Sequence, residues 1–314
     1  MDLDLEGTGI DPAALRRYLE QQVYSLPGTD RHRDAFTVLL TGSRTTGMFG
    51  PKSDVDIDVL CPQAVYASVH AASRAAGIID SPTSFFRTLK GDDWDRYYGR
   101  QMGRPHFAFT PLETAERQIA RFEDVPLWIW TNARILIDPN DQFRQIAKGF
   151  QGYPPAVLKK KIKYRWMMAG YWEVECYPHH HGEDDEGLLP AATAVLNAVN
   201  ELLRFFFLVE ARPFPYTEKL MPYAAATKLG RRYCGMLREV AGLAIGTAGR
   251  ELPAWGRLDR AMEILCCCDI DQQADEFEQA CQEAMIDAGV DPDWVKADFQ
   301  NIEELLSGEL GPLP

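Results

Sequence analysis

The sequence lacks the features that mark membrane-spanning and secreted proteins. Its 314 residues contain no uninterrupted apolar run of about eighteen residues, the length that first suggests a membrane-spanning helix. The N-terminus, Met1 to Ile10, is acidic, whereas a secretory signal starts with a basic region and continues with an apolar one. We therefore expect a soluble, cytoplasmic protein without a membrane partner.

The spacing of the cysteines suits neither a zinc site nor a disulfide framework. The seven cysteines are an odd number, three of them are the adjacent Cys266, Cys267 and Cys268, and none belongs to a Cys-x-x-Cys pair. We expect reduced thiols that pack within helices.

Basic side chains are fewer than acidic ones in the chain as a whole. The 33 lysines and arginines face 46 aspartates and glutamates, which gives a formal net charge of −13. A field of this sign repels a phosphate backbone, so long nucleic acid is a disfavoured partner. A cationic small molecule, or a nucleotide neutralised by bound metal, meets no such repulsion. The oligomeric state has no signature in the sequence.

Strands and helices alternate in the first part of the chain. Apolar residues predict a buried strand over Phe36 to Leu40 and a second strand over Val55 to Leu60. A helix is expected from Pro62 to about Ala76, and a third strand over His106 to Phe109. This alternation predicts a small mixed sheet with flanking helices over residues 1–150.

The pattern changes near Gly152-Tyr153-Pro154-Pro155, which marks a boundary. Strand-like alternation then gives way to helical stretches at about residues 156–175, 187–210, 218–243, 255–267 and 271–288. We expect an α+β protein in which the sheet domain is followed by a mostly helical bundle over residues 151–314.

The segment from Gly42 to Asp58 carries the clearest chemistry. At the end of a strand, Gly42 lets the backbone approach a phosphate closely, because it has no side chain. Ser43 adds a hydroxyl and a backbone N–H, and a following helical turn would supply further donors. Arg44 and Lys52 could contact phosphate oxygens.

Three aspartates alternate with apolar residues along the second strand. Alternation puts Asp54, Asp56 and Asp58 on one side of the sheet, with neighbouring Cα atoms roughly 6.5 to 7 Å apart. Carboxylates on one face repel one another unless cations are bound, and all-oxygen ligands favour Mg²⁺. Two ions about 3.5 to 4 Å apart could be held there. The alternative is a tight β-turn-β connection with a solvated acidic edge.

This segment resembles the nucleotidyltransferase superfamily, whose pattern is Gly-Ser, about ten residues, and then Asp-x-Asp or Asp-x-Glu. Gly42, Ser43, Asp54 and Asp56 stand at the matching positions, and Asp58 is an extra acid. The resemblance covers residues 36–61 and implies a catalytic domain that uses two Mg²⁺ ions and ATP or another NTP.

Two further segments are similar to the aminoglycoside-modifying branch of that superfamily. Asn132 to Pro139 looks like the end of its catalytic domain, and a helical C-terminal domain is what that branch carries. Pro213 to Leu220, which contains Lys219, is similar to an element that helps to enclose nucleotide and acceptor.

The sequence departs from the family pattern at the third carboxylate. His106 stands where that acid is expected, and an imidazole can act as a general base near neutral pH. A backbone hydrogen bond at a strand end would explain it equally well. Asp80 and Asp95 are other candidates, each also explained by a cap or surface role. Glu113 is better explained by a capping box with Thr110.

Three other groups of residues have competing interpretations. Asn197, Glu201 and Arg204 share one helix face and could supply a base, although a polar network at the core edge explains them better. His179 to His181 could bind a transition metal, but a solvated loop is the simpler account. Phe205 to Phe207 could line an acceptor pocket or form the buried end of a helix.

These observations predict an enzyme that transfers an NMP, in the first instance AMP from ATP, to a hydroxyl of a small molecule and releases pyrophosphate. An aminoglycoside-like cation would suit the acidic chain as acceptor. Transfer to tRNA or protein, as in toxin–antitoxin relatives, is the enzymatic alternative. A non-catalytic nucleotide-binding regulatory module is the third possibility, because the third acid is missing.

Overall fold

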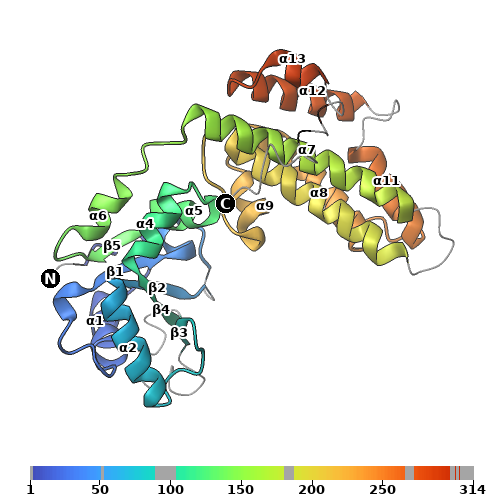
Figure 1. Ribbon diagram of the computed structural model, residues 1–314. Coiled ribbons are helices and arrows are strands. Elements are labelled where there is room, and N and C mark those ends of the chain that lie inside the picture. The colour runs from blue at the N-terminus through green and yellow to red at the C-terminus, as the bar shows by residue number, and fades with distance from the viewer. Residues whose placement is uncertain are drawn as a thin grey trace. The chain divides into compact units, whose positions relative to one another are not determined.

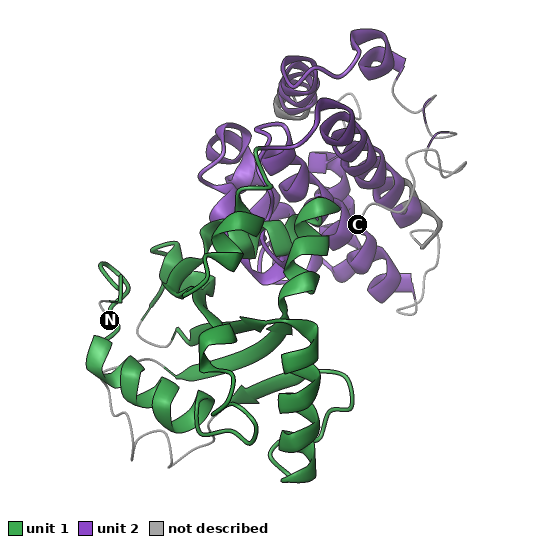
Figure 2. Cartoon of the chain, turned by 60° about the vertical axis from the view of Figure 1, so that its left-hand side comes forward, with its two compact units in different colours: residues 1–151 green, residues 152–314 purple. Residues whose placement is uncertain are grey.

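The computed structural model describes residues 3–50, 53–88, 104–179, 187–265 and 272–297, together with Asn301 and Glu304. The chain divides into two compact units, Met1–Gln151 and Gly152–Pro314, shown in Figure 2. The first unit contains the sheet and the second is helical (Figure 1), so the predicted α+β class is confirmed.

The first unit is built on a mixed five-stranded sheet with the order β3-β4-β2-β1-β5. Its strands are β1 (Thr37–Thr41), β2 (Val55–Cys61), β3 (Phe85–Thr88), β4 (Pro105–Pro111) and β5 (Arg134–Ile137). The central pair β2 and β4 is parallel, whereas every other neighbouring pair is antiparallel. The four-residue strands β3 and β5 therefore form the two edges.

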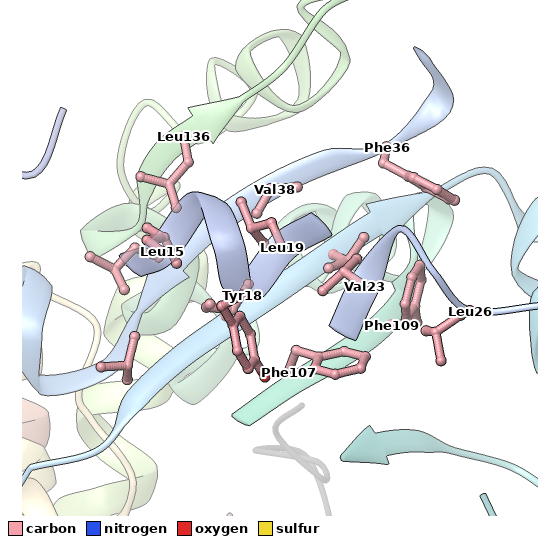
Figure 3. Packing of buried hydrophobic residues seen from close by; sticks show 14 of the residues in the cluster. Leu15, Tyr18, Leu19, Val23, Leu26, Phe36, Val38, Phe107, Phe109 and Leu136 are labelled. Carbon is pink, nitrogen blue, oxygen red and sulfur yellow. The ribbon is translucent and has the colours of Figure 1, made fainter. Parts of the chain in front are cut away.

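One face of the sheet is covered by the N-terminal helices, α1 (Pro12–Tyr18) and the π-helix η1 (Leu19–Val23). Asp11 caps α1 by accepting a hydrogen bond from the N–H of Ala13 at 2.9 Å. Figure 3 shows side chains of these helices pointing at apolar strand residues, and Tyr18 meets Phe107 edge to face at 6.1 Å. Val55, Ile57 and Val59 of β2 are buried in this core.

The other helices of the first unit are α2 (Gln63–Ala75), α4 (Leu112–Ala120), α5 (Asp124–Asn132) and α6 (Gln142–Ala147). The capping box predicted for α4 is wrong. Strand β4 continues through Thr110 to Pro111, and no side chain caps α4. The carboxylate of Glu113 instead accepts the N–H of Gln63 at 3.0 to 3.1 Å, so it caps the start of α2.

The described helices of the second unit are α7 (Pro155–His179), α8 (Leu188–Leu208), α9 (Thr217–Ala224), α10 (Lys228–Ala244), α11 (Ala254–Leu265), α12 (Gln272–Asp287) and α13 (Pro292–Ala297). By length and composition α8 is apolar enough to span a membrane, but 67% of that window is buried inside the protein, as in the core helix of a soluble protein. Phe205, Phe206 and Phe207 near its end are at most 1% exposed. They form core and cannot line an acceptor pocket.

The single helix predicted over residues 218–243 is two helices. The chain turns between α9 and α10 at Thr227, whose hydroxyl caps α10 by accepting the N–H of Gly230 at 2.9 Å. A Cβ on Gly230 would lie 1.8 Å from the carbonyl oxygen of Ala224, so the turn requires glycine there. The helical periodicity continues across this turn, which explains why the sequence pattern hides it.

Candidate active site

The bend after β1 brings the Gly-Ser pair against one of the strand acids. Gly42 has a φ of 73° and begins the 3₁₀ turn η3 (Gly42–Thr45). A Cβ on Gly42 would stand 2.1 Å from Oδ2 of Asp56, so only glycine leaves room for that carboxylate. Ser43, which follows, is 6% exposed. The bend and Asp56 therefore belong to one site.

The first two strand acids converge on one point. Asp54 Oδ2 lies 3.4 Å from Nε2 of His106, and Asp56 Oδ1 lies 3.3 Å from the same nitrogen. The side chain of Asp54 is 46% exposed and that of Asp56 is 39% exposed. Val55 and Ile57, which alternate with them, are buried in the core. Both carboxylates thus project from the face opposite the apolar core and remain accessible to a ligand.

The sheet places His106 beside these acids. In the parallel register of β2 and β4, Asp56 pairs with His106, and in the antiparallel register of β3 and β4, Thr88 pairs with it. Nδ1 of His106 lies 3.2 Å from Oγ1 of Thr88, and the ring of Phe86 stands 5.6 Å from the imidazole centroid. The imidazole is therefore held at both nitrogens and on one face.

These neighbours raise the pKa of His106. The largest cause is its hydrogen bond to Asp56, which outweighs the opposing effect of burial, and the charges of Asp56 and Asp54 add to the increase. A raised pKa means that this imidazole holds its proton more firmly than a free imidazole does. The role of general base that the sequence suggested for His106 stays a prediction.

Asp58 shares the face but differs from the other two acids. Its Oδ2 accepts a hydrogen bond from Oγ1 of Thr41 at 2.8 Å. Burial is the main cause that raises its pKa to about 6, against the lowering effect of the Thr41 hydrogen bond. Its carboxylate thus has a hydrogen-bond partner on β1, whereas Asp54 and Asp56 face His106, and its assignment as a metal ligand stays a prediction.

Arg44 has a structural role. It is 5% exposed, and its guanidinium donates to three backbone carbonyls, those of Asp54 at 3.1 Å, Thr8 at 3.0 Å and Ser53 at 2.9 Å. These bonds tie the N-terminal segment and the start of β2 to the bend. This role accounts for Arg44 without the phosphate contact that the sequence suggested, because each of its three nitrogens donates to a backbone carbonyl.

The site contains two carboxylates that could hold a divalent cation. Mg²⁺ typically takes one or two protein carboxylates and completes its octahedron with substrate phosphates and water. Asp54 and Asp56 supply two accessible carboxylates, and Gly42 brings the backbone of the bend beside one of them. Among the described residues, no three His, Cys, Asp or Glu side chains form a ready-made metal site.

The remaining predicted site residues belong to other elements or lie outside the described residues. Lys219 belongs to α9 in the second unit, where its Nζ is 3.5 Å from a carboxylate oxygen of Glu218. Asp80 is exposed between α2 and β3. His179 ends α7. Lys52, Asp95, His180 and His181 lie outside the described residues.

Glu201 and Arg204 form a polar network inside the helical unit. Glu201 is 7% exposed and is paired with Arg165 at 2.8 Å and with Arg204. Both guanidinium groups stand over the ring of Phe214, at 5.2 and 5.8 Å from its centroid. Arg204 also donates to Oγ1 of Thr217 at 3.3 Å. This network orders the segment before α9, so we assign no proton transfer to Glu201.

Two residues of the site were missed by sequence reasoning. Thr88 and Phe86 lie on β3, a strand of four residues in which Phe85 is buried and Phe86 is 61% exposed. Such a short edge strand has too few residues for a clear alternation. The available signal was the Phe85-Phe86 pair after the turn residues Ser81 and Pro82.

Comparison with known proteins gives a family match and similarities to solved structures. Residues 120–220 match a family described as a domain of unknown function, DUF4037. A nucleotidyltransferase-like protein from Exiguobacterium sibiricum, known from its crystal structure, is similar over 87% of this chain and 78% of its own, with 10% sequence identity and a TM-score of 0.42. No curated protein matches the sequence. None of these matches points to the aminoglycoside-modifying branch.

Proposed function

We propose that the protein is a Mg²⁺-dependent nucleotidyltransferase. It would transfer an NMP, with ATP as the first donor to test, to a hydroxyl group and release pyrophosphate. The observation that carries the proposal is the convergence of Asp54 and Asp56, each within 3.4 Å of one imidazole nitrogen, beside a bend in which only glycine fits against Asp56.

In this proposal the residues of the bend and of β2 act by positioning and by charge. Asp54 and Asp56 would hold the cation, and the backbone of Gly42 and Ser43 would contact the triphosphate. The bound cation would neutralise phosphate charge and polarise the α-phosphate. The acceptor oxygen forms a bond to the α-phosphorus, the bond to the β-phosphate bridging oxygen breaks, and pyrophosphate leaves with that electron pair. The hydroxyl proton passes to a base that the described residues do not identify.

A small-molecule acceptor fits the charge of the chain. With 46 acidic and 33 basic residues, the protein repels a long phosphate backbone, whereas a cationic alcohol such as an aminoglycoside is attracted. Transfer to tRNA would require binding that weakens steeply as salt is added. A cytoplasmic location, where ATP and Mg²⁺ are available, belongs to the same proposal.

The test is pyrophosphate release from ATP and Mg²⁺ in the presence of a panel of acceptors, with Asp56→Asn as the inactive control. Activity that depends on one acceptor, and is lost in the variant, supports the proposal. Equal activity in the Asp56→Asn protein would contradict it. Retained folding of the variant is checked by its circular dichroism and melting temperature.

A non-catalytic nucleotide-binding module is the second candidate. The observation that favours it is His106, which occupies the strand position beside Asp56 and brings no third carboxylate to the acids. Binding of ATP and Mg²⁺ without pyrophosphate release across the panel would support this candidate over the enzyme.

A further inference from the structure

We propose that this site binds a single divalent cation together with the nucleotide. It would thus differ from a two-metal site, which binds two ions. The inference rests on the proposed function, because it concerns the same two carboxylates. Two observations support it. His106 is held beside Asp54 and Asp56 by Thr88 and Phe86, and Asp58 is hydrogen-bonded to Thr41.

His106 stands at the point where both acids meet. Its Nε2 is 3.4 Å from Asp54 Oδ2 and 3.3 Å from Asp56 Oδ1, so the imidazole fills the position beside the two carboxylates. An imidazole nitrogen cannot supply the negative charge that a carboxylate would bring to that place. The cluster therefore contains two carboxylates and one imidazole.

The imidazole is too well held to move aside for a second ion. Thr88 lies 3.2 Å from its Nδ1, and Phe86 stands 5.6 Å from the ring. His106 is only 15% exposed, and it lies at a sheet position paired with a neighbouring strand on each side. Displacing the ring would break contacts on β2 and β3 together.

No other described acid replaces the missing carboxylate. Asp58 is the nearest acid along β2, but its Oδ2 accepts the Thr41 hydroxyl at 2.8 Å and its side chain is partly buried. Among the described residues, no three His, Cys, Asp or Glu side chains are arranged so that together they could hold a metal ion. Two carboxylates are a sufficient protein contribution to one Mg²⁺ that also binds phosphates.

This site has too little negative charge to offset the repulsion between two divalent cations. Two divalent cations about 3.5 to 4 Å apart repel strongly, and anionic ligands on both sides normally offset that repulsion. Here the two acids would have to neutralise both ions, with an imidazole in place of the third acid. One cation per bound nucleotide is the stoichiometry that this ligand set supports.

The experiment is electron paramagnetic resonance with Mn²⁺ as the probe. The full chain is mixed with an α,β-methylene ATP analogue, which cannot transfer its NMP, and bound Mn²⁺ is counted against an analogue-only control. Two Mn²⁺ ions about 3.5 to 4 Å apart give an exchange-coupled spectrum, whereas a single ion gives an isolated one. The readout does not depend on turnover.

We expect one bound Mn²⁺ and an uncoupled spectrum for the wild type. His106→Asp, which adds the carboxylate, is expected to bind two ions and to show coupling. His106→Asn, its neutral match, is expected to stay at one ion, and it covers the case in which the Asp variant does not fold.

Two coupled ions in the wild type would overturn the one-cation inference and leave the proposed function standing. Coupling in His106→Asn would also overturn it, because the variant adds no charge. Absence of both Mn²⁺ and nucleotide binding in the wild type would reject the proposed function itself, so the two failures are distinguishable.

Discussion

Replacing Gly42 by alanine should damage the site far more than the fold. The added Cβ would stand 2.1 Å from Oδ2 and 3.0 Å from Cγ of Asp56. Ordinary contacts of a Cβ begin near 3.4 Å, so the carboxylate must retreat by more than about 1 Å. The backbone would tolerate this, because a carboxylate can rotate away, but a metal ligand displaced by that distance no longer meets its cation.

Gly47 provides a matched control. Its φ of 75° is nearly the same as the 73° of Gly42, but a Cβ on Gly47 meets no atom within 4 Å. An alanine in the left-handed region costs about 1 to 2 kcal/mol at either position. Both variants should therefore lose a similar amount of stability, and only Gly42→Ala should lose more than about tenfold in nucleotide affinity, equivalent to about 1.4 kcal/mol.

The assay combines urea denaturation with calorimetric titration of a non-hydrolysable ATP analogue in Mg²⁺. Wild-type affinity in Gly42→Ala would refute the placement of Asp56 against the bend. An equal loss of affinity in Gly47→Ala would show that backbone strain, rather than the carboxylate, decides binding.

Three other predictions concern stability and are measured by urea denaturation. The carboxyl group of Asp58 has a pKa that is raised from 3.8 to about 6, so it binds its proton more tightly in the folded protein than in the unfolded chain. The free energy of unfolding of the wild type should therefore fall as the pH rises from about 4 to about 6, and Asp58→Asn should remove this fall. Its gain at pH 8 is at most about 3 kcal/mol, and a variant that is no more stable than the wild type there would contradict the burial of this carboxylate. Arg44→Met should cost about 2 to 4 kcal/mol, because it removes three charge-assisted bonds to backbone carbonyls, and a neutral result would refute the structural role of Arg44. Glu201→Ala should cost about 3 kcal/mol by leaving Arg165 and Arg204 without their shared partner, and a loss below about 1 kcal/mol would show that the network is solvated.

The central strands, and the shared face of Asp54 and Asp56, could be predicted from the sequence. Strands β1 and β2 are short apolar or alternating runs, and the alternation of acids with Val55 and Ile57 fixes which face of β2 each side chain occupies. Gly42 indicated the bend in the sequence. The structure shows that glycine is needed there because the carboxylate of Asp56 packs against it, whereas the sequence suggested the approach of a phosphate.

Long-range contacts could not be predicted from the sequence. Glu113 caps a helix that begins 50 residues earlier, although its local pattern fits a capping box. Arg44 reaches the carbonyl of Thr8, 36 residues away, although as a residue beside a glycine bend it resembles a phosphate contact. In both cases the local sequence suggests a nearby or bound partner, whereas the tertiary fold supplies a partner that is distant in the sequence.

The most direct test of the account is the affinity of the ATP analogue for wild type, Asp54→Asn, Asp56→Asn and Asp58→Asn, titrated in Mg²⁺ and again after chelation of the metal. We predict metal-dependent binding by the wild type and by Asp58→Asn, and a loss of more than about tenfold in each of the other two variants. Undiminished, metal-dependent binding by Asp56→Asn would contradict the claim that these carboxylates hold the cation.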